Sequence, residues 1–132
     1  MVSTLDVNSA LYRLVNVPAI NDVISGKVYI GSFPDGNQDE NITINTLTNP
    51  NQYLQNGYMN LNVYVQEPSS GVPPLSRFKQ IIDVLIPLVL DAQKDYTYFF
   101  QIDDDKGFFK DTDHDGMWFY NLRLEFQQHN NS

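Results

Sequence analysis

The sequence predicts an α+β fold, with a mainly antiparallel β-sheet and two principal helices packed on one of its faces. Apolar residues recur at helical spacing near the N-terminus and again in the middle of the chain. Between these two segments, and after the second, apolar and polar residues alternate with a period of two, as in half-buried strands. Eight Tyr, eight Phe and one Trp supply the rings that packed sheets favour.

The length of 132 residues predicts a single domain, residues 1–132, with the segment 127–132 frayed. The formal net charge is −8 with only eight Lys and Arg, so we expect no tight binding to nucleic-acid phosphates. Cys is absent, which excludes disulfides and thiolate metal sites. The N-terminal residues do not resemble a signal peptide, and no apolar run is long enough for a bilayer. We therefore expect a soluble protein made in the cytoplasm, without a membrane partner.

Two segments have helical periodicity, about residues 4–15 and about residues 75–93, with Ser76 as a possible cap of the second. Between them, Pro18 is expected to open a short helical turn that Gly26 closes. The second helix has the stronger core stripe, which consists of Phe78, Ile81, Ile82, Leu85 and Val89.

This second helix is also apolar outside its core stripe. Val84, Ile86, Leu88 and Leu90 widen the stripe until the second half is apolar almost all round. Such a helix is buried on more than one side, and in a domain of this size another subunit is expected to supply the second cover. Pro87 is expected to kink the helix, at a cost of roughly 3 kcal/mol unless the local geometry adapts.

The strands are predicted from alternation between turn-forming segments. The clearest is 59–66, where four apolar residues face one way and polar residues and a Tyr the other. The acidic stretch "DTDHDG" at 111–116 is expected to form the tip of a closing β-hairpin. The predicted strands are 27–30, 42–48, 59–66, 95–103 and 117–126.

The same acidic stretch raises the alternative of a calcium-stabilised binding module. Asp111, Asp113 and Asp115 copy the first half of a calcium loop. A full loop also needs oxygen ligands at its ninth and twelfth positions, where this chain has Phe119 and Leu122, and the flanks read as strands rather than helices. Aspartates at a solvated turn explain the pattern without an ion, so we expect no metal and no cofactor.

Catalytic patterns are weaker still. His114 at the turn and His129 in the tail have no nucleophile at a suggestive spacing, and we expect both to be solvated. The chain has no phosphate-cradling glycine loop and no zinc-protease motif. We therefore expect a protein that is not an enzyme.

Four aromatic residues are expected in loops, where rings are costly to leave in water. They are candidates for contact with other subunits, because interfaces favour Tyr and Phe. The alternative, that they lap over the core of their own domain, is equally open. With Leu88 of the second helix, the candidate interface residues are Phe33, Tyr53, Tyr58, Leu88 and Phe108.

The order of these motifs is similar to a known family. An amphipathic helix precedes "GKVYIG", then "ENITINTLT" and "GYMNLNVYV" follow, a helix comes after a proline-bearing linker, and "NLRLEF" closes the chain. This order, over about residues 5–127, resembles the tail completion or tail terminator proteins of long-tailed bacteriophages and prophages, which are related to head-tail joining proteins. The acidic turn 111–116 is not a feature of that family.

The resemblance implies a function as well as a fold. Members of the family are structural virion proteins that assemble as homo-oligomeric, typically hexameric, rings. Such a ring caps the growing tail tube, binds the tail tube protein and docks to the head connector or stopper protein. It is assembled in the host cytoplasm and remains at the head-proximal end of the tail, where DNA passes through its lumen without specific binding. A head completion or stopper protein is the neighbouring alternative within this resemblance.

Overall fold

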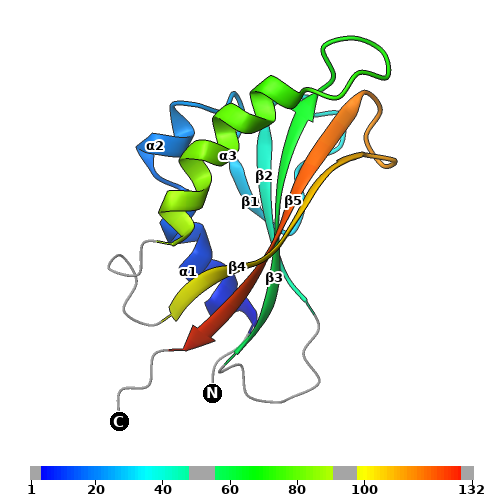
Figure 1. Cartoon of the computed structure of the whole chain (residues 1–132). Helices are drawn as coiled ribbons and strands as arrows, with labels where there is room; N and C mark the ends of the chain where they lie inside the picture. Colours follow the sequence, from blue (N-terminus) through cyan, green and yellow to red (C-terminus); the bar gives the residue numbers. More distant parts are fainter. Residues whose placement is uncertain (1–3, 48–55, 91–97, 129–132) are drawn as a thin grey trace.

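Within the described residues 4–47, 56–90 and 98–128, a computed structural model of the chain contains three helices and five strands (Figure 1). The fold is α+β with a mostly antiparallel sheet, as the sequence predicts. The elements are α1 (Thr4–Val15), α2 (Pro18–Asn21), β1 (Val28–Ile30), β2 (Asn41–Thr46), β3 (Asn56–Gln66), α3 (Leu75–Val89), β4 (Tyr98–Lys110) and β5 (Met117–Gln128).

The five strands form one sheet in the order β1-β2-β3-β5-β4. Only β1 and β2 run parallel, and every other neighbouring pair is antiparallel. The central pair, β3 and β5, matches over eleven residues, from Asn56 opposite Gln127 to Gln66 opposite Met117. The edges of the sheet are therefore the three-residue strand β1 and the long strand β4.

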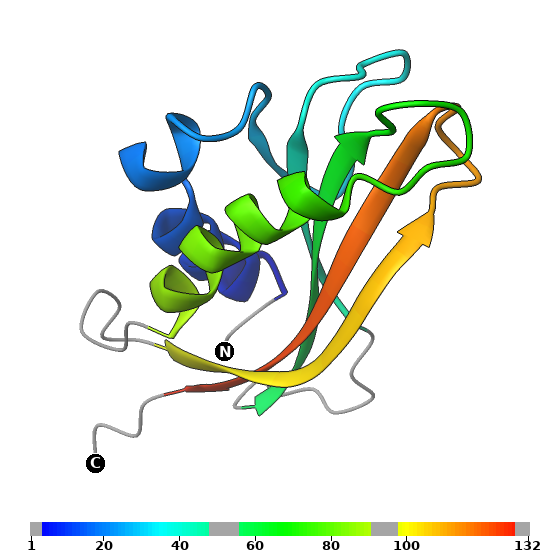
Figure 2. The ribbon, with the colours of Figure 1, turned by 45° about the horizontal axis from the view of Figure 1, so that its top comes forward.

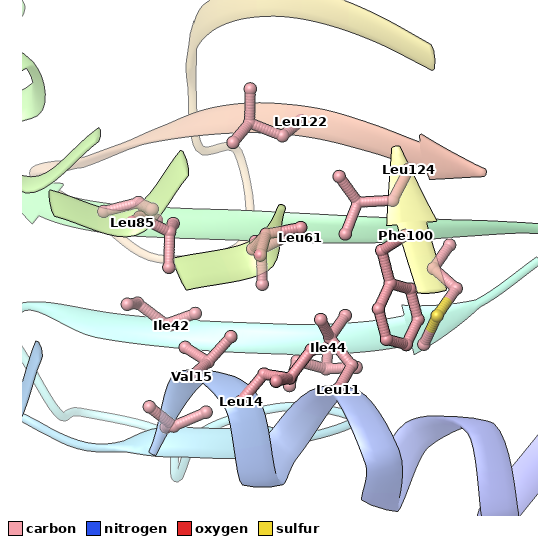
Figure 3. Packing of buried hydrophobic residues seen from close by; sticks show 14 of the residues in the cluster. Leu11, Leu14, Val15, Ile42, Ile44, Leu61, Leu85, Phe100, Leu122 and Leu124 are labelled. Carbon is pink, nitrogen blue, oxygen red and sulfur yellow. The ribbon is translucent and has the colours of Figure 1, made fainter. Parts of the chain in front are cut away.

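The core lies between this sheet and the helices. Alternate residues of β3, from Met59 to Val65, are buried, as period two predicts. In β5 the partners Leu122 and Leu124 complete the same face. Because these side chains are fully enclosed, truncation of any one of them is expected to cost about 2–5 kcal/mol. Figure 3 shows how residues of both layers meet there, among them Leu11, Leu14, Val15, Ile42, Ile44, Leu61, Leu85 and Phe100.

All three helices cover the same face of the sheet, which Figure 2 shows from the side. Helix α1 packs on β1 and β2, while α3 packs on α1 and β3. Residues from both helices and from all five strands belong to one hydrophobic cluster. The opposite face of the sheet carries polar and aromatic side chains and is called the open face below.

Helix α3 buries the predicted stripe of Phe78, Ile81, Ile82, Leu85 and Val89. Two details of the sequence prediction are wrong. The helix ends at Val89 rather than near residue 93, and Pro74 rather than Ser76 occupies the N-cap, without a side-chain hydrogen bond. Pro87 lies in the last turn of the helix, where it has no backbone N–H to donate to the carbonyl of Asp83.

Strand β4 extends beyond its predicted end at residue 103 and continues through the acidic segment 103–105. Its register against β5 shifts between Ile102 and Asp104 and again between Asp105 and Gly107. Each shift is a β-bulge, which adds one residue to the strand and increases its local twist. Pairing with β5 therefore continues through the aspartates to Lys110. Phe108, expected in a loop, is part of this edge strand.

Gly26 serves a different purpose from the predicted end of a helix, since α2 already ends at Asn21. A Cβ atom at Gly26 would lie 2.0 Å from Oδ1 of Asn41. The buried Asn41 side chain accepts a hydrogen bond from the backbone of Lys27 at 3.1 Å and so joins the start of β1 to β2. Glycine is required here by close approach rather than by its backbone angles.

The C-terminal prediction was partly wrong. Residues 127 and 128 belong to β5, where Gln127 pairs with both Asn56 and Phe99, so they are not frayed. The remaining residues of the predicted tail, 129–132, lie outside the described residues, as do Tyr53 and His129.

Candidate interaction surface

The acidic turn between β4 and β5 is held by contacts within the chain. One carboxylate oxygen of Asp111 lies 2.6 Å from Nδ1 of His114, and the other accepts a hydrogen bond from the backbone N–H of Asp113 at 2.9 Å. Asp111 is buried, whereas Asp113 and Asp115 point to solvent. The hairpin closes with a hydrogen bond from the backbone N–H of Asp111 to the carbonyl of Met117. This is the predicted hairpin tip.

The arrangement does not gather the three candidate calcium ligands. Both oxygens of Asp111 already have partners within the turn, and Asp111 is buried whereas Asp113 and Asp115 are exposed. Across the described part of the chain, no group of three or more His, Cys, Asp or Glu side chains is placed to hold a metal ion. A calcium ion at this turn would have to displace His114 from Asp111.

His114 is not the solvated side chain that the sequence predicts. Its ring stacks on the ring of Phe33, with centroids 4.3 Å apart, and its side chain is 19% exposed. Tyr64 completes this small cluster: its ring and that of Phe33 form a T-shaped pair, with centroids 4.8 Å apart. Burial is the main cause of the raised pKa of the Tyr64 hydroxyl. The cluster fixes the loop 31–40, which carries Phe33, to the open face and the hairpin tip.

Two further ties hold the loops at this end of the sheet, and sequence reasoning missed both. The indole N–H of Trp118 donates to the carboxylate of Glu67 at 3.0 Å, which anchors the linker that leads to α3. Arg77, near the start of α3, donates to both oxygens of Glu40 and to the carbonyl of Val23. The hydrogen bond to Glu40 is the main reason that the pKa of Arg77 is raised. Glu and Arg at such separations give no periodic signal, so only the structure reveals these pairs.

The open face carries a row of amides rather than cations. Asn121 is buried and donates through its side-chain amide to Oδ1 of Asn62 at 2.6 Å. Beside this row, the guanidinium of Arg123 lies 4.4 Å from the centre of the Tyr58 ring and pairs with Asp103 at 3.3 Å. Arg123 is therefore neutralised locally, and the row offers no free positive charge for a phosphate backbone.

The helix face of the sheet is left partly uncovered at its outer side, between α3 and the edge strand β4. A groove of about 470 Å³ lies there. We call it the α3–β4 groove, and its apolar and aromatic lining consists of Leu75, Phe78, Ile82, Ile86, Phe108 and Tyr120. Of the lining residues, Leu75 is 53% exposed and Phe108 is 42% exposed. Apolar side chains so exposed around one hollow are typical of a surface that meets another protein.

Two polar pairs also line the groove: Lys79 and Asp83 form an ion pair at 3.0 Å, and Tyr120 meets Asp105. The hydroxyl of Tyr120 donates a hydrogen bond to the carboxylate of Asp105. Burial of the ring, and then this bond, raise the pKa of Tyr120 to about 12. The hydroxyl is thus neutral at physiological pH and is already satisfied, which leaves the groove a predominantly apolar recognition surface.

The predicted interface residues divide among different surfaces. Phe108 lines the α3–β4 groove, and its contact with another subunit stays a prediction. Leu88 is half-buried and packs against the core of its own domain. Phe33 is only 3% exposed and also covers its own domain, as the alternative held. Tyr58 lies in β3 rather than in a loop and is 38% exposed on the open face.

A search with protein-family models and a search of curated proteins found no match to this sequence. No helix in the described residues has the length and apolar character needed to cross a membrane.

Proposed function

We propose that this protein is a structural subunit of a bacteriophage tail, which assembles as a homo-oligomeric ring, most simply a hexamer, and terminates the tail tube. The ring joins the tail to the head connector or stopper protein and is not an enzyme. It is assembled in the host cytoplasm and remains in the virion at the head-proximal end of the tail. The order of sequence motifs supports this proposal, and the α+β fold agrees with it.

The observation that carries the proposal is the α3–β4 groove at the free edge of the sheet. A chain that worked alone would gain by covering Leu75 and Phe108, which are 53% and 42% exposed. A subunit of a ring covers such a surface with its neighbour, and burial of apolar area is the main driving force of that association.

The negative charge of the protein supports the proposal that DNA passes through the lumen of the ring without binding to it. The formal net charge is −8. Among the described residues, Arg77, Lys79 and Arg123 each form an ion pair with a carboxylate. An acidic channel repels the phosphates that pass through it, so DNA slides rather than binds. We expect no measurable binding of duplex DNA at physiological salt in a fluorescence anisotropy titration.

The decisive experiment measures the assembly of the purified full chain by native mass spectrometry and negative-stain imaging over a wide concentration range. We expect rings of about six subunits, with assembly favoured at high concentration. A strict monomer at every concentration would overturn the proposal. Addition of a purified tail tube protein then separates the two roles, because a terminator binds the tube whereas a head completion protein binds only the connector.

A further inference from the structure

The sheet has two free edges, and each carries an exposed apolar residue. Edge strands with unpaired backbone groups are templates for pairing with another chain. At the β1 edge, Ile30 is 43% exposed, and at the β4 edge, Phe108 is 42% exposed. These two edges lie on opposite sides of the same five-stranded sheet, so one molecule cannot bring them together.

The direction of the strands allows the two edges to meet in successive copies. β1 runs parallel to β2, and three antiparallel pairings then follow, so β4 runs opposite to β1. A β1 strand from a second copy, placed beside β4 in the same sheet orientation, is therefore antiparallel to it, which is the favourable geometry for edge pairing.

The helix layer would continue in the same arrangement. Helix α1 flanks β1 in each copy, whereas α3 is the helix nearest the β4 side. With β1 of a second copy beside β4, α1 of that copy lies beside α3 and over the α3–β4 groove. The sheet and the helix layer of one copy would continue into those of the next copy, so the apolar lining of the groove would lose its contact with water.

Charge complementarity favours the same partner. β4 exposes three consecutive aspartates; the carboxylate of Asp104 lies 3.9 Å from the ammonium of Lys106, and Arg123 of β5 is its register partner. Lys27, directly before β1, is exposed, and its ammonium forms no ion pair with any described residue. In an antiparallel register that sets Lys27 opposite the aspartates of β4, these opposite charges attract each other.

We propose that the α3–β4 groove receives the β1 edge of a second copy of this chain, head to tail, with Lys27 of that copy near Asp104. This inference rests on the proposed ring and specifies its interface. Because the two surfaces differ and lie on opposite edges, every copy uses both at once, and a head-to-tail contact of this kind closes into a ring when its rotation permits.

Variants at two adjacent phenylalanines, Phe108 and Phe109, test the groove. Phe108 faces the groove, whereas Phe109 is 45% exposed and faces the open side, where it stacks on Phe119. Truncation of a central aromatic contact typically weakens an interface by at least about tenfold. We expect Phe108→Ser to raise the concentration needed for half-assembly by at least about tenfold and Phe109→Ser by less than about threefold. Assembly is measured by sedimentation velocity, and far-ultraviolet circular dichroism verifies that both variants fold.

A charge exchange tests the partner surface. Lys27→Glu and Asp104→Lys should each weaken assembly, because each places like charges at the contact, and the double variant should restore it. Rescue by the double variant cannot arise from misfolding of either single variant.

The outcomes separate this inference from the proposed function. If the wild-type chain forms rings, Phe108→Ser leaves them intact and the charge exchange gives no rescue, the groove is not the interface, although the ring itself stands. A wild-type chain that forms only dimers would indicate that two β4 edges pair with each other, which would overturn the head-to-tail contact. A wild-type monomer at all concentrations would overturn the ring itself.

Discussion

Replacement of Phe33 by Ala should show that loop 31–40 is part of the folded core rather than a free surface loop. The Phe33 ring is 3% exposed and lies between two other rings, with centroid distances of 4.3 Å to His114 and 4.8 Å to Tyr64. Removal of the ring leaves the hairpin tip and the loop without their shared contact.

The expected loss follows from the burial and the ring contacts. Full burial of a Phe side chain contributes about 1.5–3 kcal/mol, and a well-placed aromatic pair adds about 0.5–1.5 kcal/mol. A loop can partly collapse into the space, so the loss should fall near or below the 3–5 kcal/mol typical of Phe→Ala in a rigid core. We expect the Phe33→Ala variant to lose about 2–4 kcal/mol of unfolding free energy.

Urea unfolding followed by Trp118 fluorescence, at concentrations where the chain is monomeric, measures this loss. The matched control is Phe109→Ala, because Phe109 is 45% exposed and stacks on a single ring, that of Phe119. The control should lose less than about 1 kcal/mol. If Phe33→Ala loses no more than the control, the loop is not anchored by this ring and the reasoning fails.

Three further predictions concern other contacts. Replacement of Arg77 by Met should cost about 1–3 kcal/mol, because Glu40 loses the guanidinium donors and keeps only the backbone N–H of Ser25. A double-mutant cycle with Glu40→Gln should recover part of that loss, and additive losses would contradict the pairing. Tyr120 contributes stability that is fully present below pH 10 and is lost as the pH rises toward its pKa of about 12. The unfolding free energy of the Tyr120→Phe variant should therefore fall less steeply with pH over this range than that of the wild type. Identical pH dependence in the two proteins would contradict the raised pKa of Tyr120. Millimolar calcium, compared with chelator, should move the thermal midpoint by less than about 1 °C, since both oxygens of Asp111 are engaged; a rise of several degrees would restore the calcium alternative.

The burial of individual faces could be predicted because it depends on local periodicity. Alternate residues of β3 and the stripe of α3 were assigned correctly from spacing alone, and so was the hairpin with its acidic tip at 111–116. These patterns record which side of an element meets the core, and each is complete within about ten to fifteen residues. The α+β class follows from the order of such segments.

The candidate interaction surface could be predicted only in part. The excess of apolar residues on α3 and the choice of Phe108 both fall at the α3–β4 groove, where contact with another subunit stays a prediction. The strand that carries Phe108 was missed, because three aspartates and a glycine resemble a loop. Two β-bulges allow that segment to stay paired with β5, and bulges depend on the partner strand rather than on local composition.

The sequence by itself determined which faces are apolar, the net charge of −8 and the position of the closing hairpin. Only the tertiary structure decided that Phe33 is enclosed, that His114 pairs with Asp111, and that β1 and β4 form the free edges of the sheet. The physical reason is that periodicity acts between near neighbours, whereas ring clusters and sheet edges are set by pairings between segments far apart in the chain.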